Sequence, residues 1–171
     1  MARHARILAL GFTFAMTLLA SVSASAQPDN AFAGVDGVKI IVETPSDDAG
    51  RCNVTKGSLD ASVRLPIDKS RLRIAERNRA FASVYVNVNV IPLSADFCVA
   101  NVKVSLQRLV LLPSVIGKKA ADAGDMMFSA TVWSQASLLS GRSVDFGSRV
   151  NVSVTELANE LIAGWIEANP K

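Results

Sequence analysis

The sequence predicts an α+β fold: a two-layer sandwich in which two helices cover one face of a mainly antiparallel sheet of about five strands. Residues 83–91 alternate between apolar and polar side chains, which is typical of a strand with one face on a core. Residues 153–168 carry apolar side chains three and four positions apart, which is typical of an amphipathic helix. The order of segments (strand, helix, four strands, helix) then places both helices on one side of the sheet.

Residues 1–26 predict a secretory signal peptide. A basic head, Met1–Arg6, precedes an apolar run, and Ser23–Ala26 supplies the small residues of an A-x-A cleavage site. The apolar run is shorter than the roughly 20 residues that a comfortable membrane span needs. We therefore expect a bacterial periplasmic or secreted protein that is soluble and has no membrane span once the signal peptide is removed.

Removal of the signal peptide changes the composition of the working chain. Arg3 and Arg6 leave with it, so the formal net charge of +3 falls by two, and the single histidine, His4, leaves as well. A nearly neutral chain gives no reason to expect nucleic acid as a partner. We expect residues 27–36 to be a flexible N-terminal lead and residues 37–171 to form one domain.

The first half of this domain contains three predicted elements. Val38–Val42 is a β-branched run and predicts the first strand. Residues 55–67 fit two interpretations: their alternation predicts a strand, whereas a cap at Thr55 and a stop at Pro66 predict a helix. Residues 71–75 predict a short strand.

The second half contains three longer strands and the final helix. After residues 83–91, the segment 98–107 alternates in the same way, with Cys98 facing inward, and an apolar run, Leu109–Leu112, follows it. In residues 126–135, Val132 is expected to face inward and Trp133 outward. The final helix is expected to start at a capping box, Ser153–Glu156, with Val152 and Leu157 as a hydrophobic staple, and to bury Trp165.

The two cysteines, Cys52 and Cys98, predict a disulfide. An even pair of cysteines in an oxidising compartment usually forms a structural bond. A redox-active or metal-binding pair is not favoured, because the chain has no C-x-x-C motif and no nearby histidine to lower a thiol pKa.

Three stretches together carry a resemblance. They are Tyr85–Asn89 (Y-V-N-V-N), Val104–Leu111, and Ala130–Ser134 followed by a helix that ends in Ala168–Lys171. They resemble a group of small secreted bacterial proteins in which the stretch matching residues 55–67 looks helical, and this resemblance implies a helix there. The order of elements also looks like the N-terminal α/β module of TolB-type periplasmic proteins. These motifs are structural, and they imply no catalytic residue.

The remaining chemistry does not favour an enzyme. Without histidine the mature chain has no Ser-His-Asp or Cys-His arrangement, no histidine ligand for a metal, and no glycine-rich phosphate loop. Two carboxylate pairs, Asp47 with Asp48 and Asp122 with Asp125, could in principle act as an acid and a base, or hold calcium. Both pairs lie in predicted loops, where solvated turn residues are the simpler interpretation. We expect no catalytic residue, no cofactor and no metal.

A basic cluster is the first candidate surface. It consists of Lys69, Arg71, Arg73, Arg77 and Arg79, and Arg71 and Arg73 are expected to share the exposed face of a strand. The planar guanidinium group of arginine suits phosphates and carboxylates, so the four arginines are a candidate anion-binding site. The alternative is an edge strand that uses charge to prevent pairing with other sheets.

The polar face of the sheet is the second candidate surface. Tyr85, Asn87, Asn89 and Trp133 would lie there as a platform for a sugar or a peptide. The alternative interpretation is an ordinary solvent-facing surface. The same face is expected to carry five further polar residues, Asn101, Ser105, Gln107, Thr131 and Gln135.

Together these features predict a non-enzymatic periplasmic binding or assembly module. Its partner would be an unknown envelope protein or an anionic envelope component. Two alternatives stay open: a structural accessory subunit of an envelope complex, and a hydrolase that uses carboxylates.

Overall fold

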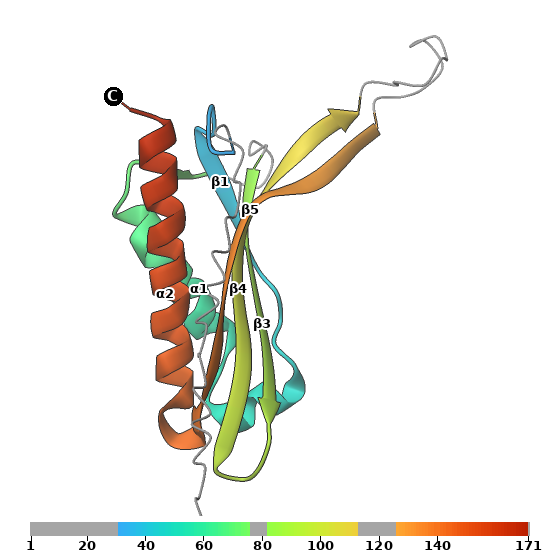
Figure 1. Cartoon of the computed structure of the whole chain (residues 1–171), viewed down its shortest axis with the longest axis vertical. Helices are drawn as coiled ribbons and strands as arrows, with labels where there is room; N and C mark the ends of the chain where they lie inside the picture. Colours follow the sequence, from blue (N-terminus) through green and yellow to red (C-terminus); the bar gives the residue numbers. More distant parts are fainter. Residues whose placement is uncertain (1–30, 76–81, 113–125, 171) are drawn as a thin grey trace, which may run out of the picture.

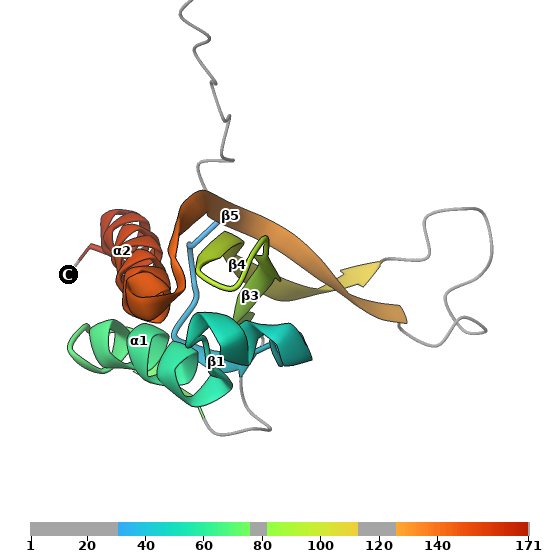
Figure 2. The ribbon, with the colours of Figure 1, turned by 90° about the horizontal axis from the view of Figure 1, so that it is seen from below.

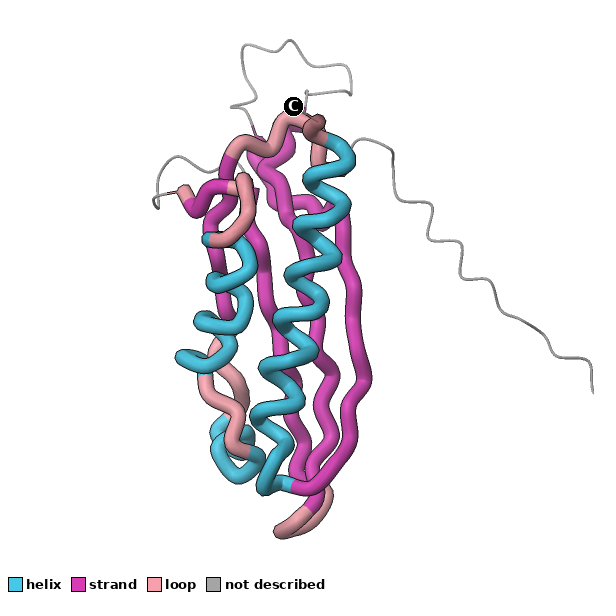
Figure 3. Tube along the Cα trace, turned by 90° about the vertical axis from the view of Figure 1, so that its left-hand side faces the viewer, coloured by secondary structure: helices cyan, strands magenta, loops and turns pink. Residues whose placement is uncertain are grey.

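The structure is a computed structural model, and it describes residues 31–75, 82–112 and 126–170. Five strands form one sheet in the order β2-β1-β3-β4-β5. Figures 1 and 3 show the long helix α2 and the shorter helix α1 packed on one face of this sheet. The predicted α+β two-layer fold is therefore confirmed. The elements are β1 (Gly37–Val42), η1 (Asp47–Cys52), α1 (Lys56–Asp68), β2 (Arg73–Ile74), β3 (Ala82–Pro92), β4 (Phe97–Leu112), β5 (Met126–Arg142) and α2 (Ser143–Ala168).

Some predicted features lie outside the described residues. These are the signal peptide, two of the four arginines and the second carboxylate pair: residues 1–26, Arg77, Arg79, Asp122 and Asp125.

The sheet is mixed. β3, β4 and β5 pair antiparallel, whereas β1 lies between β2 and β3 and is parallel to both. Parallel neighbours need a crossover connection, and α1 is part of the crossover between β1 and β2. The antiparallel part is long, with β4 paired along its whole length to β5.

The core lies between the helices and the inward side of the sheet. Alternate residues of β3 from Ala82 to Val90, and of β4 from Cys98 to Leu106, are at most 5% exposed, as their sequence pattern predicts. They meet the apolar stripe of α2, which includes Phe146, Val150 and Leu161, all at most 1% exposed. Trp165 is buried as predicted, and its Nε1 donates to the carbonyl oxygen of Val35 at 2.7 Å. The described part of the expected flexible lead, residues 31–36, is therefore held against the core, and Phe32 and Val35 are buried.

Residues 56–68 form a helix, which decides between the two interpretations of this segment. Thr55 is the N-cap, and its side chain accepts a hydrogen bond from the backbone N–H of Ser58 at 3.2 Å. Leu59, Val63 and Ile67 are fully buried on one side of the helix, at the helical spacing of four. A strand would have placed these same residues, together with Ala61 and Leu65, on one face, but Leu65 is 55% exposed.

The predicted start of the last helix is wrong. α2 begins at Ser143, directly after β5, so Ser153 lies inside the helix and is only 4% exposed. Phe146 and Val150 are buried and lie on the same side of the helix as Val154, at intervals of four residues. Their burial stabilises the helix on the N-terminal side of the expected cap. Val152 is 55% exposed, so it does not form the expected hydrophobic staple.

A β-bulge in β5 changes which residues face the core. Leu106 pairs with Trp133 and Gln107 pairs with Thr131, so Val132 is an extra residue without a partner in β4. Because Leu106 faces the core, Trp133 faces it too. Beyond the bulge, the β4–β5 ribbon bends away from the rest of the sheet, as the yellow and orange strands in Figure 1 show.

Candidate functional site

The candidate site is the face of the sheet that neither described helix covers (Figure 2). On this face Tyr85, Asn87 and Asn89 of β3 lie opposite Ser105, Lys103 and Asn101 of β4. Glu43 follows β1 directly and joins the same group. We call six of these residues the open face: Glu43, Tyr85, Asn87, Asn89, Asn101 and Lys103.

Glu43 is the centre of a hydrogen-bond network on the open face. The Tyr85 hydroxyl donates to Oε2 of Glu43 at 2.8 Å, and the Asn87 side-chain amide donates to the same oxygen. The hydrogen bond from Asn87, followed by that from Tyr85, lowers the pKa of the Glu43 carboxyl from its ordinary value. The same contact with Glu43 raises the pKa of Tyr85. The network fixes two side chains of β3 and leaves Asn89, Asn101 and Lys103 exposed beside them.

The sequence reasoning did not identify Glu43. The pattern of β3 shows that Tyr85 and Asn87 share a face, but it does not show which residue lies beside them. Glu43 reaches them because β1 pairs parallel to β3, with Ile41 opposite Tyr85. The sequence does show a carboxylate, Glu43, directly after the predicted first strand. Its place beside Tyr85 and Asn87 follows only once the pairing of β1 with β3 is known.

The prediction that Trp133 lies on this face is wrong. Trp133 is 5% exposed and its ring packs at a tilt against Phe32, with 6.0 Å between ring centroids. The extra residue Val132 reverses the alternation, so Trp133 points to the core. Gln135 pairs with the core-facing Val104 and therefore also lies on the helix side of the sheet. Of the predicted platform, Tyr85, Asn87 and Asn89 share the open face.

The described part of the basic cluster does not form one strand face. β2 contains Arg73 but not Arg71, which precedes it. The Arg71 guanidinium lies 5.6 Å from the centroid of the Trp165 ring and donates to the Asn169 carbonyl oxygen at 3.4 Å. Arg71 therefore interacts with the C-terminal end of α2, where a positive charge is favoured by the helix dipole. Anion binding by Arg71, Arg73, Arg77 and Arg79 stays a prediction.

Cys52 and Cys98 form the predicted disulfide. Their Cα atoms are 6.2 Å apart, and both residues are buried. The bond joins the end of η1 to the start of β4, across 46 positions of sequence. It holds the loop that leads into α1 against the sheet.

The described carboxylates form no metal site. No group of three histidine, cysteine, aspartate or glutamate residues in residues 31–75, 82–112 and 126–170 could hold a metal ion. Asp47 and Asp48 are exposed on η1, and Asp48 is 4.0 Å from Arg51. Within the same ranges, no helix is long and apolar enough to cross a membrane.

Comparisons with known proteins give only distant structural matches. No family model matches the chain, and no curated protein matches it. Among solved structures, the chain is similar to a variant PelC dodecamer from Paraburkholderia phytofirmans, with 18% sequence identity and a TM-score of 0.40. This match covers 76% of this chain and 90% of that one. Similarity at this level assigns no family and carries no functional argument. The two resemblances noted from the sequence stay predictions.

Proposed function

We propose that this protein is a non-enzymatic binding or assembly module of the bacterial envelope, and that its open face contacts an envelope partner. The observation that carries the proposal is the network of Glu43, Tyr85 and Asn87 on a sheet face that no described helix covers. The predicted signal peptide and the disulfide support a location in an oxidising compartment outside the cytoplasm.

The network favours binding because it orders side chains before a partner arrives. Immobilising a side chain on binding costs about 0.5–1.5 kcal/mol, and this cost is smaller for groups that hydrogen bonds already hold. Asn89 and Asn101 lie opposite each other and are exposed, so their amides offer donors and acceptors beside the ordered pair. A polar partner surface of a protein or a glycan fits this arrangement.

Site-specific photo-crosslinking in cells tests the proposal. A photoreactive amino acid is placed at Asn89 or Asn101 on the open face and, in control chains, at Glu160 or Ala163 on the exposed side of α2. We expect a discrete adduct from the two open-face positions and none from the helix positions. Adducts from α2 without adducts from the open face would show that the proposed surface is wrong.

Tyr85 gives a second test of the same surface. Tyr85→Phe removes the hydroxyl that donates to Glu43 but keeps the ring. In a chain that carries the photoreactive group at Asn89, this change is expected to reduce the adduct yield. An unchanged yield would mean that the network does not contribute to the contact.

A further inference from the structure

One edge of strand β1, the side away from β3, is largely unpaired within the described residues. β2 is two residues long and pairs only with Gly37 and Val38, and the N–H of Ala75 donates to the Val38 carbonyl at 2.9 Å. Further along β1, no described strand lies on that side of Lys39–Val42. Among the described residues, nothing pairs with this side of Lys39–Val42, which leaves an edge to which a further strand could be added.

The backbone groups available at this edge can be named. In a parallel ladder, alternate residues direct both their N–H and their C=O to opposite neighbours. The N–H of Glu43 donates to the Val86 carbonyl at 3.0 Å, which places the odd-numbered residues of this stretch toward β3. Ile40 and Val42 therefore present their backbone donors and acceptors to the open edge.

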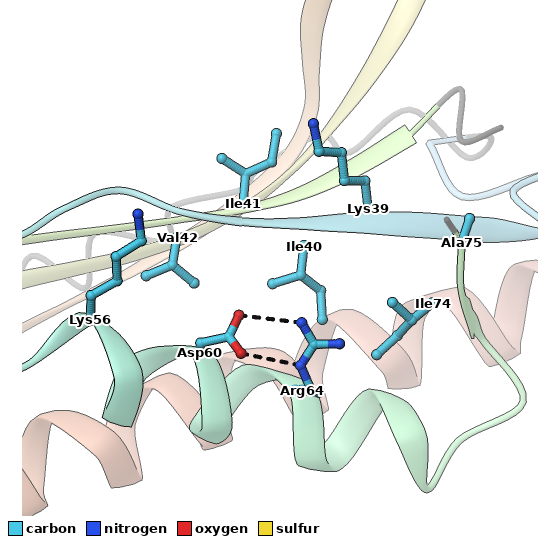
Figure 4. A pocket seen from close by; sticks show the side chains of 9 residues that line it. All are labelled: Lys39, Ile40, Ile41, Val42, Lys56, Asp60, Arg64, Ile74 and Ala75. Carbon is cyan, nitrogen blue, oxygen red and sulfur yellow. Dashed lines mark hydrogen bonds and ion pairs between the residues drawn. The ribbon is translucent and has the colours of Figure 1, made fainter. Parts of the chain in front are cut away.

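A groove of about 740 Å³ runs beside this edge, between β1 and α1 (Figure 4). Ile40, Val42 and Ile74 form its apolar part. An added strand would place every second side chain against this part and the remaining side chains toward Lys39 and Ile41. The residues that line the groove are Lys39, Ile40, Ile41, Val42, Lys56, Asp60, Arg64, Ile74 and Ala75.

The charges around the groove indicate which kind of strand fits. The Asp60 carboxylate is paired with Arg64, with contacts of 3.1 and 3.4 Å to the guanidinium (Figure 4). Lys39 and Lys56 have no carboxylate within ion-pair distance in the described part of the chain, and Nζ of Lys56 donates only to the Thr44 hydroxyl at 3.3 Å. The groove therefore carries two positive charges that no described carboxylate balances.

We propose that an extended acidic segment of a partner protein binds here by adding a strand to β1. Its main chain would pair with Ile40 and Val42, its apolar side chains would enter the groove, and its carboxylates would contact Lys39 and Lys56. A second copy of this chain fits less well. Antiparallel pairing of two β1 edges would bring lysines together, and the other sheet edge, β5, has no aspartate or glutamate between Met126 and Arg142. The inference concerns the edge of the sheet and does not depend on the open face.

Amide hydrogen exchange measured by NMR tests the strand pairing. In the free protein the amides of Ile40 and Val42 are expected to exchange faster than that of Ile41, which pairs with β3. The probe is an acetylated and amidated hexapeptide of alternating glutamate and valine, which should slow exchange at Ile40 and Val42. Equal protection of all three amides in the free chain would overturn the proposal, as would no slowing by the peptide.

Charge reversal tests the partner chemistry. Lys39→Glu/Lys56→Glu should weaken binding of the acidic hexapeptide by about tenfold or more, and should favour a hexapeptide of alternating lysine and valine instead. The matched control, Arg142→Glu, changes an exposed charge at the end of β5 and should alter affinity by less than about twofold. Equal effects of the control and the double variant would overturn the proposal. Crosslinking at Asn89 reports on the open face alone, so failure of one proposal leaves the other standing.

Discussion

At the scale of single residues, Gly147 of α2 lies directly against the backbone of Asn53, in the loop after η1. A Cβ at this position would collide with the backbone carbonyl of Asn53, which has a left-handed conformation with φ 57°. The side-chain amide of Asn53 also donates to the Ser143 carbonyl at 3.0 Å, so the loop and the first turn of α2 are locked together. The loop cannot retreat without breaking this bond.

Gly147→Ala is therefore expected to destabilise the protein by about 1–3 kcal/mol, as overpacking of a well-packed contact does. Alanine favours a helix over glycine by about 1 kcal/mol, so steric conflict must outweigh that gain. Urea unfolding measures the difference. Gly57→Ala is the matched control because it lies in the first turn of α1 with open space around it, and it should be neutral or slightly stabilising. Equal effects of the two variants would contradict the steric explanation.

The Glu43 network predicts a dependence of stability on pH. Hydrogen bonds from Asn87 and then Tyr85 lower the pKa of Glu43 in the folded state. Its contribution to stability is therefore fully present above the pKa of the unfolded chain and is lost as the pH falls through the lower, folded pKa. The free energy of unfolding of the native chain should thus fall more on acidification than that of Glu43→Gln.

The same network predicts an order of effects on the Glu43 pKa. Asn87→Ala should raise it toward its ordinary value by more than Tyr85→Phe does, because the Asn87 hydrogen bond is the larger cause. NMR titration of the Glu43 carboxyl carbon measures both shifts. A Glu43 pKa that stays the same in both variants would show that the network is not formed in solution.

Trp133 shows why alternation fails at single positions. The pattern of residues 126–135 is regular enough to predict a strand, and β5 does begin at Met126. One unpaired residue, Val132, then reverses every later side chain, because strand alternation has a period of two. The bulge is defined by pairing with β4, and no local pattern in β5 shows it. Tyr85, Asn87 and Asn89 lie in a strand without such a shift, so their shared face was predictable.

At the scale of elements, α1 contains a proline that its partner helix accommodates. Pro66 has no N–H, so the carbonyl of Ser62, four residues earlier, loses its usual helical donor. Thr155 of α2 supplies a replacement, since its hydroxyl lies 3.2 Å from that carbonyl and also contacts the Asn151 carbonyl at 3.0 Å. The interface between the two helices thereby tolerates a residue that would otherwise predict the end of a helix.

A double-mutant cycle tests this compensation. Thr155→Val, which keeps the side-chain shape, should cost about 1 kcal/mol because it leaves a helix carbonyl without a donor. In a Pro66→Ala background the backbone N–H returns, so the same change should cost about 0.5–1 kcal/mol less. Urea unfolding of the four proteins measures the coupling. The explanation fails if Thr155→Val costs the same in both backgrounds.

The boundaries of the helices were less predictable than their existence. The apolar stripe identified α2, but the capping box at Ser153 indicated a start well downstream of Ser143, where the helix begins. Capping signals are local and weak, worth about 1 kcal/mol. Burial of Phe146 and Val150 against the sheet stabilises the helix by more than a cap does, and this burial is visible only in three dimensions.

At the scale of the whole molecule, the layers could be predicted but the order of strands could not. Alternation in β3 and β4 and the stripe of α2 each identify a core-facing side, and these sides must meet. The position of β1 between β2 and β3 depends on pairing between segments that are distant in sequence. The open face and the unpaired edge of β1 both result from that position, so neither complete surface was visible in the sequence.

The disulfide links the segment that leads into α1 covalently to strand β4 of the sheet. Cys52 is the last residue of η1, before α1, and Cys98 is the second residue of β4, which makes the longest antiparallel pairing of the sheet. A loop of 46 positions restricts the unfolded chain strongly, and the chain-entropy model gives about 4 kcal/mol for such a loop. Cys52→Ala/Cys98→Ala should therefore lower the free energy of unfolding by about 2–5 kcal/mol.

Urea unfolding with and without reductant measures this contribution. The native chain should lose stability when reduced, whereas the double variant should unfold at the same urea concentration in both conditions, which controls for other effects of the reductant. If the native chain unfolds identically with and without reductant, the bond does not stabilise the fold. A loss confined to the native chain would show that the junction of η1, α1 and β4 needs the covalent link between Cys52 and Cys98.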